Sequence, residues 1–549
     1  MKQAIARYRN VCLSMLMGIG VFLFWYGYYP HALSYQEQYQ LFLWTSDYLV
    51  ERVSVPGGLA DWLGEMIVQF YYIEWLGALL LAAVFVMLQQ TVWLAAKNRR
   101  SVADASSYLL SFIPSALLLW LLGDPSVLLG YAVALTMAVA VFVLNRTEGR
   151  QGLLCDLVVV PIVYWLTGTL AWTYVALRVV GNPRRMLPLA VYMLALQLSA
   201  YHWLLTQWPL QTVLLPMQYD RIPLQLPTLM WVIPVVTVIV VMIAWRKPYR
   251  WQTPVLVTVL AVLVWQGVSR GYDKDMYELI RQDYLVRNER WDEILKRAGE
   301  YQVRTPFWCN CVNLALSQKR LLADRMFDFY QSGEDALIMP RVRDLTSMLP
   351  SAEVFWRLGM VNSAQRYMFD TQESILNGRK SGRCTKRIAE CMIVNGHYKT
   401  ARKHLHLLKR SLFYRTWAAE AEQLLDNEAA VNAHPVYGRL RQLRYKEDFL
   451  YSHYEIYKML GLLFMNNHSN KMALDYFMGQ MLLQGELRGF QQYMGMVQQY
   501  GGYREMPIGY QDAMICIQRQ GAVPDSPYAN YAKRMMAERR ENDGNDEAH

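Results

Sequence analysis

The chain has 549 residues, of which 54% are hydrophobic and 18% are charged, and its formal net charge is +10. Its mean hydropathy is only +0.06. The charges are unevenly divided: residues 1–270 contain 17 Lys or Arg and 11 Asp or Glu, whereas residues 271–549 contain 38 and 34. A membrane half joined to a polar half explains this division, and a purely soluble enzyme, a disordered chain and a collagen-like or disulfide-rich secreted protein are excluded.

Nine apolar stretches in residues 1–270 predict a polytopic bundle of transmembrane helices. Most approach the ~17–25 residues needed to cross ~30 Å of hydrocarbon. The first ends in an aromatic cluster without a small-residue cleavage site, so it is not a cleaved signal peptide. The stretches are Val11–Tyr28, Ile73–Ala96, Ser107–Leu122, Val127–Leu144, Leu153–Leu166, Leu170–Val180, Leu187–Leu205, Leu226–Trp245 and Thr253–Val268.

The basic residues indicate how these helices are oriented. With nine crossings and a cytoplasmic N-terminus, 14 Lys or Arg lie in the inner loops, and the outer loops hold only Arg52, Arg221 and Arg270. Leu153–Val180 could be one long helix, but merging it would move a basic cluster outside, so the positive-inside rule favours a short hairpin around Thr167-Gly168-Thr169. We therefore expect a protein of the bacterial inner membrane in which everything after Arg270 is periplasmic. The basic residues form no single stripe, so no nucleic-acid partner is expected.

Residues 271–530 show the pattern of amphipathic helices in repeats. Gly359-Met-Val361-Asn-Ser-Ala364 and Gly396-His-Tyr398-Lys-Thr-Ala401 share the spacing of Gly and Ala, and looser copies centre on Ile294, Ala323 and Ala473. This pattern resembles tetratricopeptide repeats. The resemblance implies an α-solenoid of helix pairs with a concave face for a protein or peptide partner; irregular helical packing is the alternative. The polar residues 531–549 are expected to be disordered.

Together these patterns predict an all-α protein, with a transmembrane domain at 1–270 followed by an extracytoplasmic tetratricopeptide-like domain at 271–530. The sequence contains no phosphate-binding Gly-rich loop, no His-Glu-x-x-His and no paired Cys-x-x-Cys. The seven cysteines are scattered, which is typical of buried thiols. The sequence thus identifies no metal site and no cofactor.

The first outer loop, residues 29–70, interleaves apolar and acidic residues on both sides of the break Pro56-Gly57-Gly58. This pattern predicts two short interfacial helices along the outer leaflet. Their acidic residues would lie at the membrane surface, with Asp47 and Asp61 solvated. Glu37 follows the first crossing by about nine residues, and its simplest interpretation is also a solvated interfacial acid.

The arrangement resembles the GT-C superfold of membrane glycosyltransferases, and the whole chain resembles bacterial multi-pass proteins with a tetratricopeptide-like C-terminal region. The GT-C resemblance implies that Glu37 is the catalytic acidic residue, a general base that activates an acceptor hydroxyl. The donor would be a lipid-linked sugar, and Arg221 would stabilise the departing phosphate. Asp156, in the predicted hairpin, is the candidate for a polar substrate-binding cavity.

Two function classes follow. The first is a transferase that moves a sugar from a lipid-phosphate donor onto an acceptor of the cell envelope. The second is a non-enzymatic scaffold, in which the bilayer-embedded half anchors the repeats for an envelope assembly or secretion partner. A transporter is third, because an odd number of crossings with a one-sided domain does not match the usual paired repeats.

Overall fold

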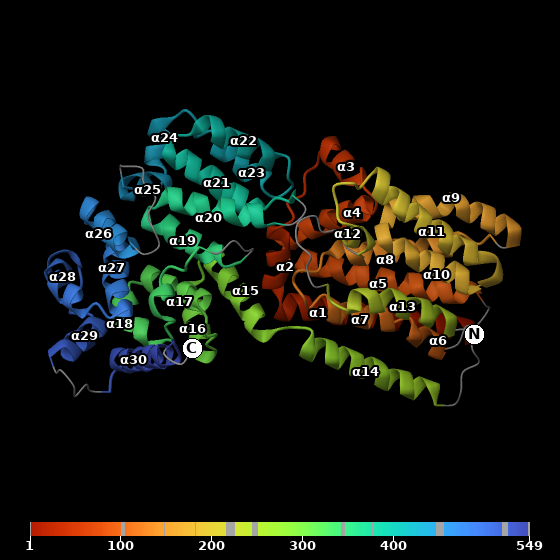
Figure 1. Cartoon of the computed structure of the whole chain (residues 1–549), viewed down its shortest axis with the longest axis horizontal. Helices are drawn as coiled ribbons and strands as arrows, with labels where there is room; N and C mark the ends of the chain where they lie inside the picture. The colour runs from red at the N-terminus through yellow and green to blue at the C-terminus, as the bar shows by residue number, and fades with distance from the viewer. Residues whose placement is uncertain are drawn as a thin grey trace. The chain divides into compact units, whose positions relative to one another are not determined.

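The computed structural model of the chain describes residues 2–99, 105–147, 149–181, 183–215, 226–243, 251–341, 346–375, 378–445, 455–518 and 525–546. Every secondary-structure element within these ranges is a helix (Figure 1), so the prediction of an all-α protein is confirmed there. The chain divides into two compact units. The first unit consists of Met1–Tyr277, Leu376–Ser381 and Arg410–Phe413, and the second of Glu278–Ile375, Gly382–Lys409 and Tyr414–His549.

The first unit contains the apolar helices. Its elements are α1 (Lys2–Tyr28), α2 (Pro30–Gln38), α3 (Ser46–Val53), α4 (Gly58–Val68), η1 (Gln69–Tyr72), α5 (Glu74–Arg99), α6 (Ala105–Leu110), α7 (Ile113–Leu121), α8 (Leu129–Leu144), α9 (Gly149–Thr167), η2 (Gly168–Leu170), α10 (Ala171–Gly181), α11 (Pro183–Trp203), α12 (Leu210–Leu214), α13 (Leu229–Ile243) and α14 (Gln252–Arg270). The following α15 (Lys274–Arg287) begins in the first unit and continues into the second.

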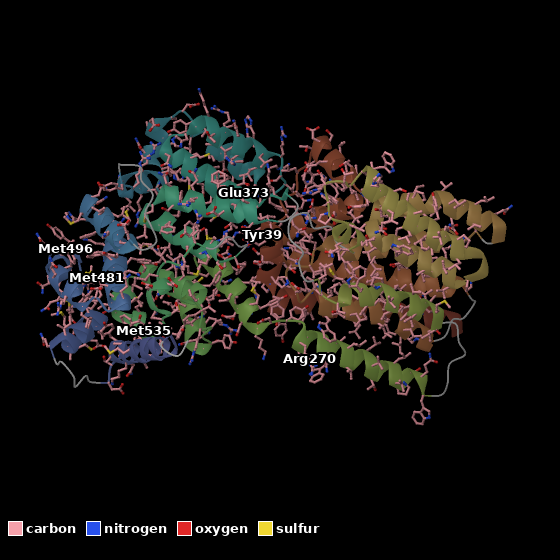
Figure 2. All side chains as sticks on the ribbon, in the orientation of Figure 1. Tyr39, Arg270, Glu373, Met481, Met496 and Met535 are labelled. Carbon is pink, nitrogen blue, oxygen red and sulfur yellow. The ribbon has the colours of Figure 1, made fainter. Side chains whose placement is uncertain are left out.

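Each of the nine predicted apolar stretches contains a helix of the first unit. By length and composition, four stretches of the described chain can cross a membrane: Tyr8–Tyr28, Glu74–Lys97, Gln151–Val180 and Gln252–Arg270. The last ends at Arg270, which is labelled in Figure 2. Shorter apolar helices occupy Ser107–Leu121, Leu129–Leu144 and Leu229–Ile243. These lengths fit a protein with membrane-spanning helices, whereas the number of nine crossings stays a prediction.

Helix α5 lies at the centre of the first unit. It packs against α1, α7, α8 and α13, and α10 packs in turn against α8 and α13 (Figure 1). Residues such as Ala78, Leu81, Phe85 and Leu88 are almost completely buried along it. Since small and large apolar side chains alternate around α5, several neighbouring helices can approach it at once.

Helices α9 and α10 form the predicted hairpin. Asp156 and Arg178 are 22 positions apart, and a straight helix would separate them by about 33 Å at 1.5 Å per residue. Instead, Nε of Arg178 lies 2.7 Å from Oδ2 of Asp156. The chain reverses at η2, where Gly168 adopts a φ of +61°. The tip of the hairpin touches the turn before α4, because Gly57 N donates a hydrogen bond to Trp165 O.

The loop before α5 differs from the two interfacial helices that the sequence predicts. It forms three helices, α2, α3 and α4, followed by η1, and α4 packs against α8 and α9. Asp47 on α3 is exposed, as expected. The expectation of solvated acids is wrong for Glu37 and Glu65, which are 4% and 1% exposed. It is also wrong for Asp61, which is only 28% exposed and pairs with Arg379. The apolar surface of α4 explains this, because it draws the neighbouring acids into the packed bundle.

The second unit consists of short helices joined by tight turns. After α15 it contains α16 (Trp291–Glu300), α17 (Pro306–Gln318), α18 (Leu322–Arg325), η3 (Met326–Asp328), η4 (Gly333–Ala336), α19 (Met348–Leu358), α20 (Val361–Ser374), α21 (Gly382–Asn395), α22 (Tyr398–Lys409), α23 (Arg415–Glu422), α24 (Glu428–Ala433), α25 (Tyr437–Leu443), α26 (Ile456–Asn466), α27 (Lys471–Gln484), α28 (Leu487–Tyr500), α29 (Ile508–Gln518) and α30 (Pro527–Asp546). Consecutive helices from α19 to α23 pack on one another, as do α26, α27 and α28.

The same turn joins five of these helix pairs. In each, a residue with positive φ ends one helix, and the next helix begins two positions later; these residues are Glu289, Arg320, Gly359, Gly396 and Gly485. The residue after it donates a hydrogen bond to the carbonyl five positions back, as Met360 N does to Phe355 O and His397 N to Met392 O. This is the Schellman geometry, which satisfies the last carbonyls of a helix and reverses the chain.

The residues that mark the predicted repeats lie in the core of the second unit. Ile294, Ala364, Ala401 and Ala473 are fully buried, and Ala323 is nearly so. Met481 on α27, labelled in Figure 2, is buried as well. At the end of the described chain, α30 spans residues that the sequence predicts to be disordered. Tyr531 on this helix is buried, and its hydroxyl donates a hydrogen bond to Leu483 O.

Candidate functional site

A buried cluster of ionised side chains lies where α3 and α4 meet in the first unit. Tyr48 and Arg52 are four residues apart on α3, and Asp61 and Glu65 are four apart on α4. Residues with this spacing share one face of a helix. Because α3 and α4 pack on each other, the two faces meet.

The turn between the two helices requires its glycines. Gly57 adopts a φ of +84°. A Cβ atom on Gly58 would lie 1.7 Å from the carbonyl oxygen of Arg52. The break that the sequence predicts at Pro56-Gly57-Gly58 is therefore a tight reversal, and it sets α3 against α4.

Glu65 is the centre of the cluster. The hydroxyl of Tyr48 donates a hydrogen bond to its Oε2, and Nε of Arg52 lies 3.2 Å from the same oxygen. Nε of Arg379 donates a 2.6 Å hydrogen bond to Oε1. One carboxylate thus contacts two guanidinium groups and a phenol. We call Tyr48, Arg52, Asp61, Glu65 and Arg379 the Glu65 node.

Arg379 reaches the node through a segment that lies far along the sequence but belongs to the first unit. Two backbone hydrogen bonds hold this segment and its companion against the extended residues after α2. Leu41 N donates to Lys380 O at 2.8 Å, and Trp44 N donates to Arg410 O at 2.9 Å. The side chain of Arg379 is 5% exposed, so it enters the node as a buried cation.

The charges of the node balance. Asp61 contributes a second carboxylate, whose Oδ2 lies 3.7 Å from Arg379. Burial raises the pKa of Asp61, and Arg379 offsets part of that rise. Burial also raises the pKa of the Tyr48 hydroxyl, and the charge of Glu65 raises it further, so Tyr48 remains a donor. Burial lowers the pKa of Arg379, but Glu65 and Asp61 outweigh it and raise that pKa. The node therefore carries no net charge, because two guanidinium groups lie opposite two carboxylates.

The residues that the sequence singles out lie elsewhere. Glu37 is buried on α2, as are the polar residues His31 and Gln38, and Gln40 just after the helix is buried too. Asp156 is fully buried in the α9–α10 hairpin. Arg221 lies outside the described residues. The structure brings neither Glu37 nor Asp156 into the Glu65 node, and the catalytic and substrate-binding roles stay predictions.

Both carboxylate oxygens of Asp156 have polar partners. Its Oδ1 accepts hydrogen bonds from Asn145 Nδ2 at 2.8 Å and from the Tyr174 hydroxyl at 2.5 Å. Its Oδ2 pairs with Arg178, whose own Nη2 also donates to Thr147 O at 2.8 Å. Such a set of partners compensates the cost of burying a carboxylate among apolar helices, and it ties α9 to α10.

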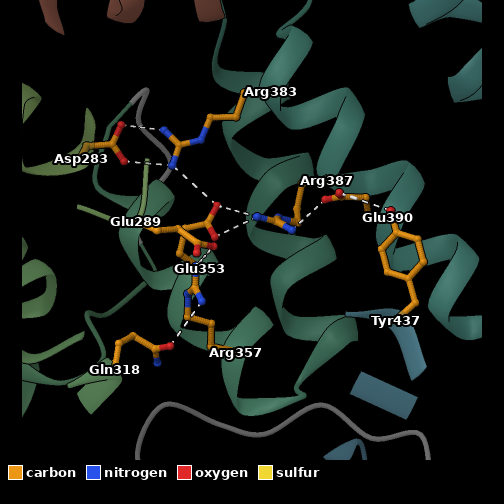
Figure 3. A network of polar contacts seen from close by, with 9 residues as sticks. All are labelled: Asp283, Glu289, Gln318, Glu353, Arg357, Arg383, Arg387, Glu390 and Tyr437. Atoms are coloured by element: carbon orange, nitrogen blue, oxygen red, sulfur yellow. Dashed lines mark hydrogen bonds and ion pairs between the residues drawn. The ribbon is translucent and has the colours of Figure 1, made fainter. Parts of the chain in front are cut away.

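The second unit contains a longer charged network, which we call the Glu353 ladder (Figure 3). Arg383 on α21 makes two hydrogen bonds with Asp283 on α15, at 2.6 and 3.0 Å. Glu353 on α19 accepts from Arg387 at 2.9 and 3.0 Å and lies 3.7 Å from Arg383. Arg387 also pairs with Glu390 at 2.7 Å. Acidic and basic side chains therefore alternate across three helices.

The alternation of acidic and basic side chains stabilises the ladder. Burial by itself raises the pKa of Glu353, but Arg387 and Arg383 outweigh burial and lower that pKa to about 2. The guanidinium of Arg387 also lies over the ring of Trp356, 4.3 Å from its centroid. At one end of the network Arg357 donates to Glu289 at 2.7 Å and to Gln318 at 3.3 Å. The ladder thus ties α15, α17, α19 and α21 together.

A second buried carboxylate of this unit, that of Asp475, has a raised pKa, whereas the pKa of Glu353 is lowered. Asp475 on α27 is 2% exposed; the Tyr503 hydroxyl donates to it, and Arg320 lies 3.5 Å away. Burial raises the pKa of Asp475 to about 6, because a single half-exposed guanidinium does not outweigh it. Arg320 also donates to Gly501 O, so the same group holds the turn between α28 and α29.

Nothing in the sequence distinguishes the residues of the Glu65 node from charged residues that lie on the surface. Glu65 and Arg379 are 314 positions apart. The spacing of Asp61 and Glu65 beside a Gly-Gly turn could have indicated a shared acidic face, but not its cation. Among the described residues, no group of three or more His, Cys, Asp or Glu could hold a metal ion. None of the seven cysteines, all of which lie in the part of the chain that the structure describes, forms a disulfide bond, and four of them are buried.

The comparisons with known proteins give a match to one family, and this match is one of sequence. The family described as "Family of unknown function (DUF6057)" matches residues 5–541, which cover nearly all of both units and the whole Glu65 node. No curated protein and no solved structure matches the chain.

Proposed function

The chain belongs to the family DUF6057, and we propose that it is an integral membrane scaffold, in which the first unit anchors a repeat-built second unit at the membrane surface. The observation that carries this proposal is the Schellman turn found five times in the second unit. Helix pairs that recur with one turn geometry stack into α-solenoids, whose extended surfaces bind protein or peptide partners. The resemblance to tetratricopeptide repeats supports the same architecture.

The partner that we propose carries an acidic surface. Helix α22 contains Lys399, Arg402, Lys403 and Lys409 and no acidic residue. Arg402 pairs with Asp426 and Lys409 with Glu422, whereas Lys399 and Lys403 are exposed. Exposed cations of this kind attract an oppositely charged patch and accelerate its association.

The test is complementation of a gene deletion by the full chain. The scaffold proposal predicts that Lys399→Glu with Lys403→Glu abolishes function at a normal protein level, because it repels an acidic partner. The control reverses two exposed cations of other helices, Lys296→Glu with Arg488→Glu, and should retain function. Full function of the α22 variant, or equal loss in both, would contradict the proposal.

We also propose the orientation in the membrane. The 14 basic residues of the inner loops against 3 of the outer loops support a cytoplasmic N-terminus, nine crossings and an extracytoplasmic second unit. The bacterial cytoplasmic membrane fits this orientation. A reporter that is active only in the cytoplasm, fused after Ala548, should be silent; activity at that position would overturn both the orientation and the odd number of crossings.

A transferase is the second candidate, and the burial of Glu37 favours it. An acid enclosed with other polar side chains on α2, directly after the first membrane helix, fits a protected site better than a solvated surface group does. In this proposal Glu37 is the general base that acts on a lipid-linked sugar donor, with Arg221 on the leaving phosphate and Asp156 on the substrate. General bases contribute typically 10²–10⁴-fold in rate.

One substitution separates the two candidates. Glu37→Gln keeps the shape of the side chain and removes its basicity. The transferase predicts loss of complementation with unchanged protein level and topology, and the scaffold predicts full complementation. Asp47→Asn is the matched control, because Asp47 is exposed on α3 and should tolerate the change in either case.

A further inference from the structure

The N-terminal end of α5 carries an exposed aromatic border. Tyr72 is 45% exposed and Trp75 is 52% exposed, at the start of the candidate span Glu74–Lys97. Trp and Tyr are enriched where membrane helices leave the hydrocarbon, because their rings are apolar and their edges are polar. This end of α5 therefore marks the level of a membrane–water interface.

The segment Arg410–Phe413 lies at the same level of the first unit. The ring of Phe413 stacks on Tyr72, with centroids 5.0 Å apart and an interplanar angle of 11°. It also meets Phe70 edge to face at 5.9 Å. Trp44, to whose backbone Arg410 is bonded, is 52% exposed. A loop that is distant in sequence thus extends the aromatic border of α5.

Two cations stand beside this border. The carbonyls of Lys380 and Arg410 are bonded to Leu41 and Trp44, three residues apart on an extended segment. This places the two backbones roughly 10 Å from each other, at ~3.3 Å per residue. Both side chains are exposed, and neither forms an ion pair within the described chain. Two unneutralised cations next to exposed aromatic rings are therefore available at the interface.

We propose that Lys380 and Arg410, with the rings of Trp44, Tyr72 and Phe413, bind the phosphate headgroups of anionic phospholipids in the leaflet that surrounds the start of α5. Cations at a membrane surface attract anionic headgroups, and each strengthens the attraction by about fivefold. The aromatic rings lie between headgroups and acyl chains. The bound lipid holds the two segments that carry Lys380 and Arg410 against the extended residues after α2, within the first unit. The inference does not depend on which side of the membrane this leaflet faces.

The experiment uses the purified full chain in neutral detergent, titrated with phosphatidylglycerol or phosphatidylcholine while thermal unfolding is followed. The wild type should be stabilised at lower concentrations of phosphatidylglycerol, and salt should weaken this preference. Lys380→Gln with Arg410→Gln should reduce the apparent affinity for phosphatidylglycerol by roughly 25-fold, about fivefold for each cation. Phosphatidylcholine binding should not change.

Two further variants make the result decisive. Lys296→Gln with Arg488→Gln removes two exposed cations of the second unit and should leave the preference intact. Lys380→Arg with Arg410→Lys keeps both charges and should also retain it. The proposal is overturned if the glutamine pair at 380 and 410 binds phosphatidylglycerol like the wild type, if the charge-keeping variant loses the preference, or if the wild type binds both lipids equally.

Discussion

The two units bury ionised groups in different ways. In the first unit, the Glu65 node is a closed group, and one of its cations comes from 314 positions away. In the second unit, the Glu353 ladder continues from helix to helix, so that most members have more than one opposite neighbour. Removing a member of the closed node leaves a buried charge without its opposite charge. In the ladder, a charged group that loses one partner keeps another. Closure by one remote residue therefore stabilises the first unit, and alternation of charges across several helices stabilises the second.

The largest effect is expected when the node loses Arg379. Arg379→Met leaves Asp61 without its buried counter-charge and Glu65 with one guanidinium, and breaking a buried ion pair costs about 3–5 kcal/mol. Arg387→Met in the ladder should cost less, because Glu353 retains Arg383. Thermal unfolding of the full chain in detergent measures both. Glu65→Gln should reduce the further cost of Arg379→Met, and additive losses would show that the node is not a coupled group.

The next largest effect is expected when acid protonates Glu353 and weakens the ladder. Arg387 and Arg383 hold the pKa of Glu353 at about 2, below its unfolded value of 4.5, so its contribution is complete above pH 4.5 and is lost as the pH falls through 2. The shift corresponds to on the order of 3 kcal/mol. Unfolding of the full chain between pH 6 and 2 should show this loss, and Glu353→Gln should flatten it. If Glu353→Gln loses as much stability as the wild type between pH 6 and 2, the role of the ladder would be contradicted.

Asp475 should show the opposite pH dependence within the same unit. Its folded pKa of about 6 lies above the unfolded value of 3.8, so the folded chain binds the additional proton between these values. Stability from this group is present below about pH 4 and is lost as the pH rises through 6, by on the order of 2–3 kcal/mol. Asp475→Asn should therefore stabilise the chain at pH 8 relative to pH 4. Glu334→Gln, on the surface beside Gln484, is a control without such a difference.

Sequence patterns predicted the local features of both units. The apolar stretches, the break at Pro56-Gly57-Gly58 and the reversal at Gly168 all depend on neighbouring residues, and each is present. The Glu65 node was missed because its closing residue, Arg379, is remote in sequence. Burial of Glu37 was missed for a related reason: the apolar surfaces that enclose α2 come from α4, α5 and η1.

The repeats were only partly recognisable because the turn geometry does not require one residue type. Gly359, Gly396 and Gly485 adopt positive φ without strain, and the first two were found by their spacing. Glu289 and Arg320 make the same turn with a side chain, at φ of 55° and 59°. A search for glycine passes over these copies, although their backbone hydrogen bonds match those of the others.

The smallest effect is expected at the turn of Gly396, which shares its conformation with Gly359 but differs from it in surroundings. A Cβ on Gly359 would lie 2.8 Å from Leu443 Cβ and 3.0 Å from its carbonyl carbon, whereas at Gly396 the nearest atom is 3.7 Å away. Gly396→Ala should therefore cost only the conformational penalty of positive φ, about 1 kcal/mol. Gly359→Ala should cost that amount and a further ~1–3 kcal/mol of overpacking.

Thermal unfolding of the full chain compares the two substitutions directly, and Arg320→Gly adds the reverse test. Glycine at position 320 relieves a strained φ but removes the contact of Arg320 with Asp475 and Gly501. If the turn geometry alone determined stability, Arg320→Gly would be stabilising; we expect a small net loss, because the side chain also holds the α28–α29 turn. Equal losses for Gly359→Ala and Gly396→Ala would show that the turns, unlike the node and the ladder, are insensitive to what packs around them.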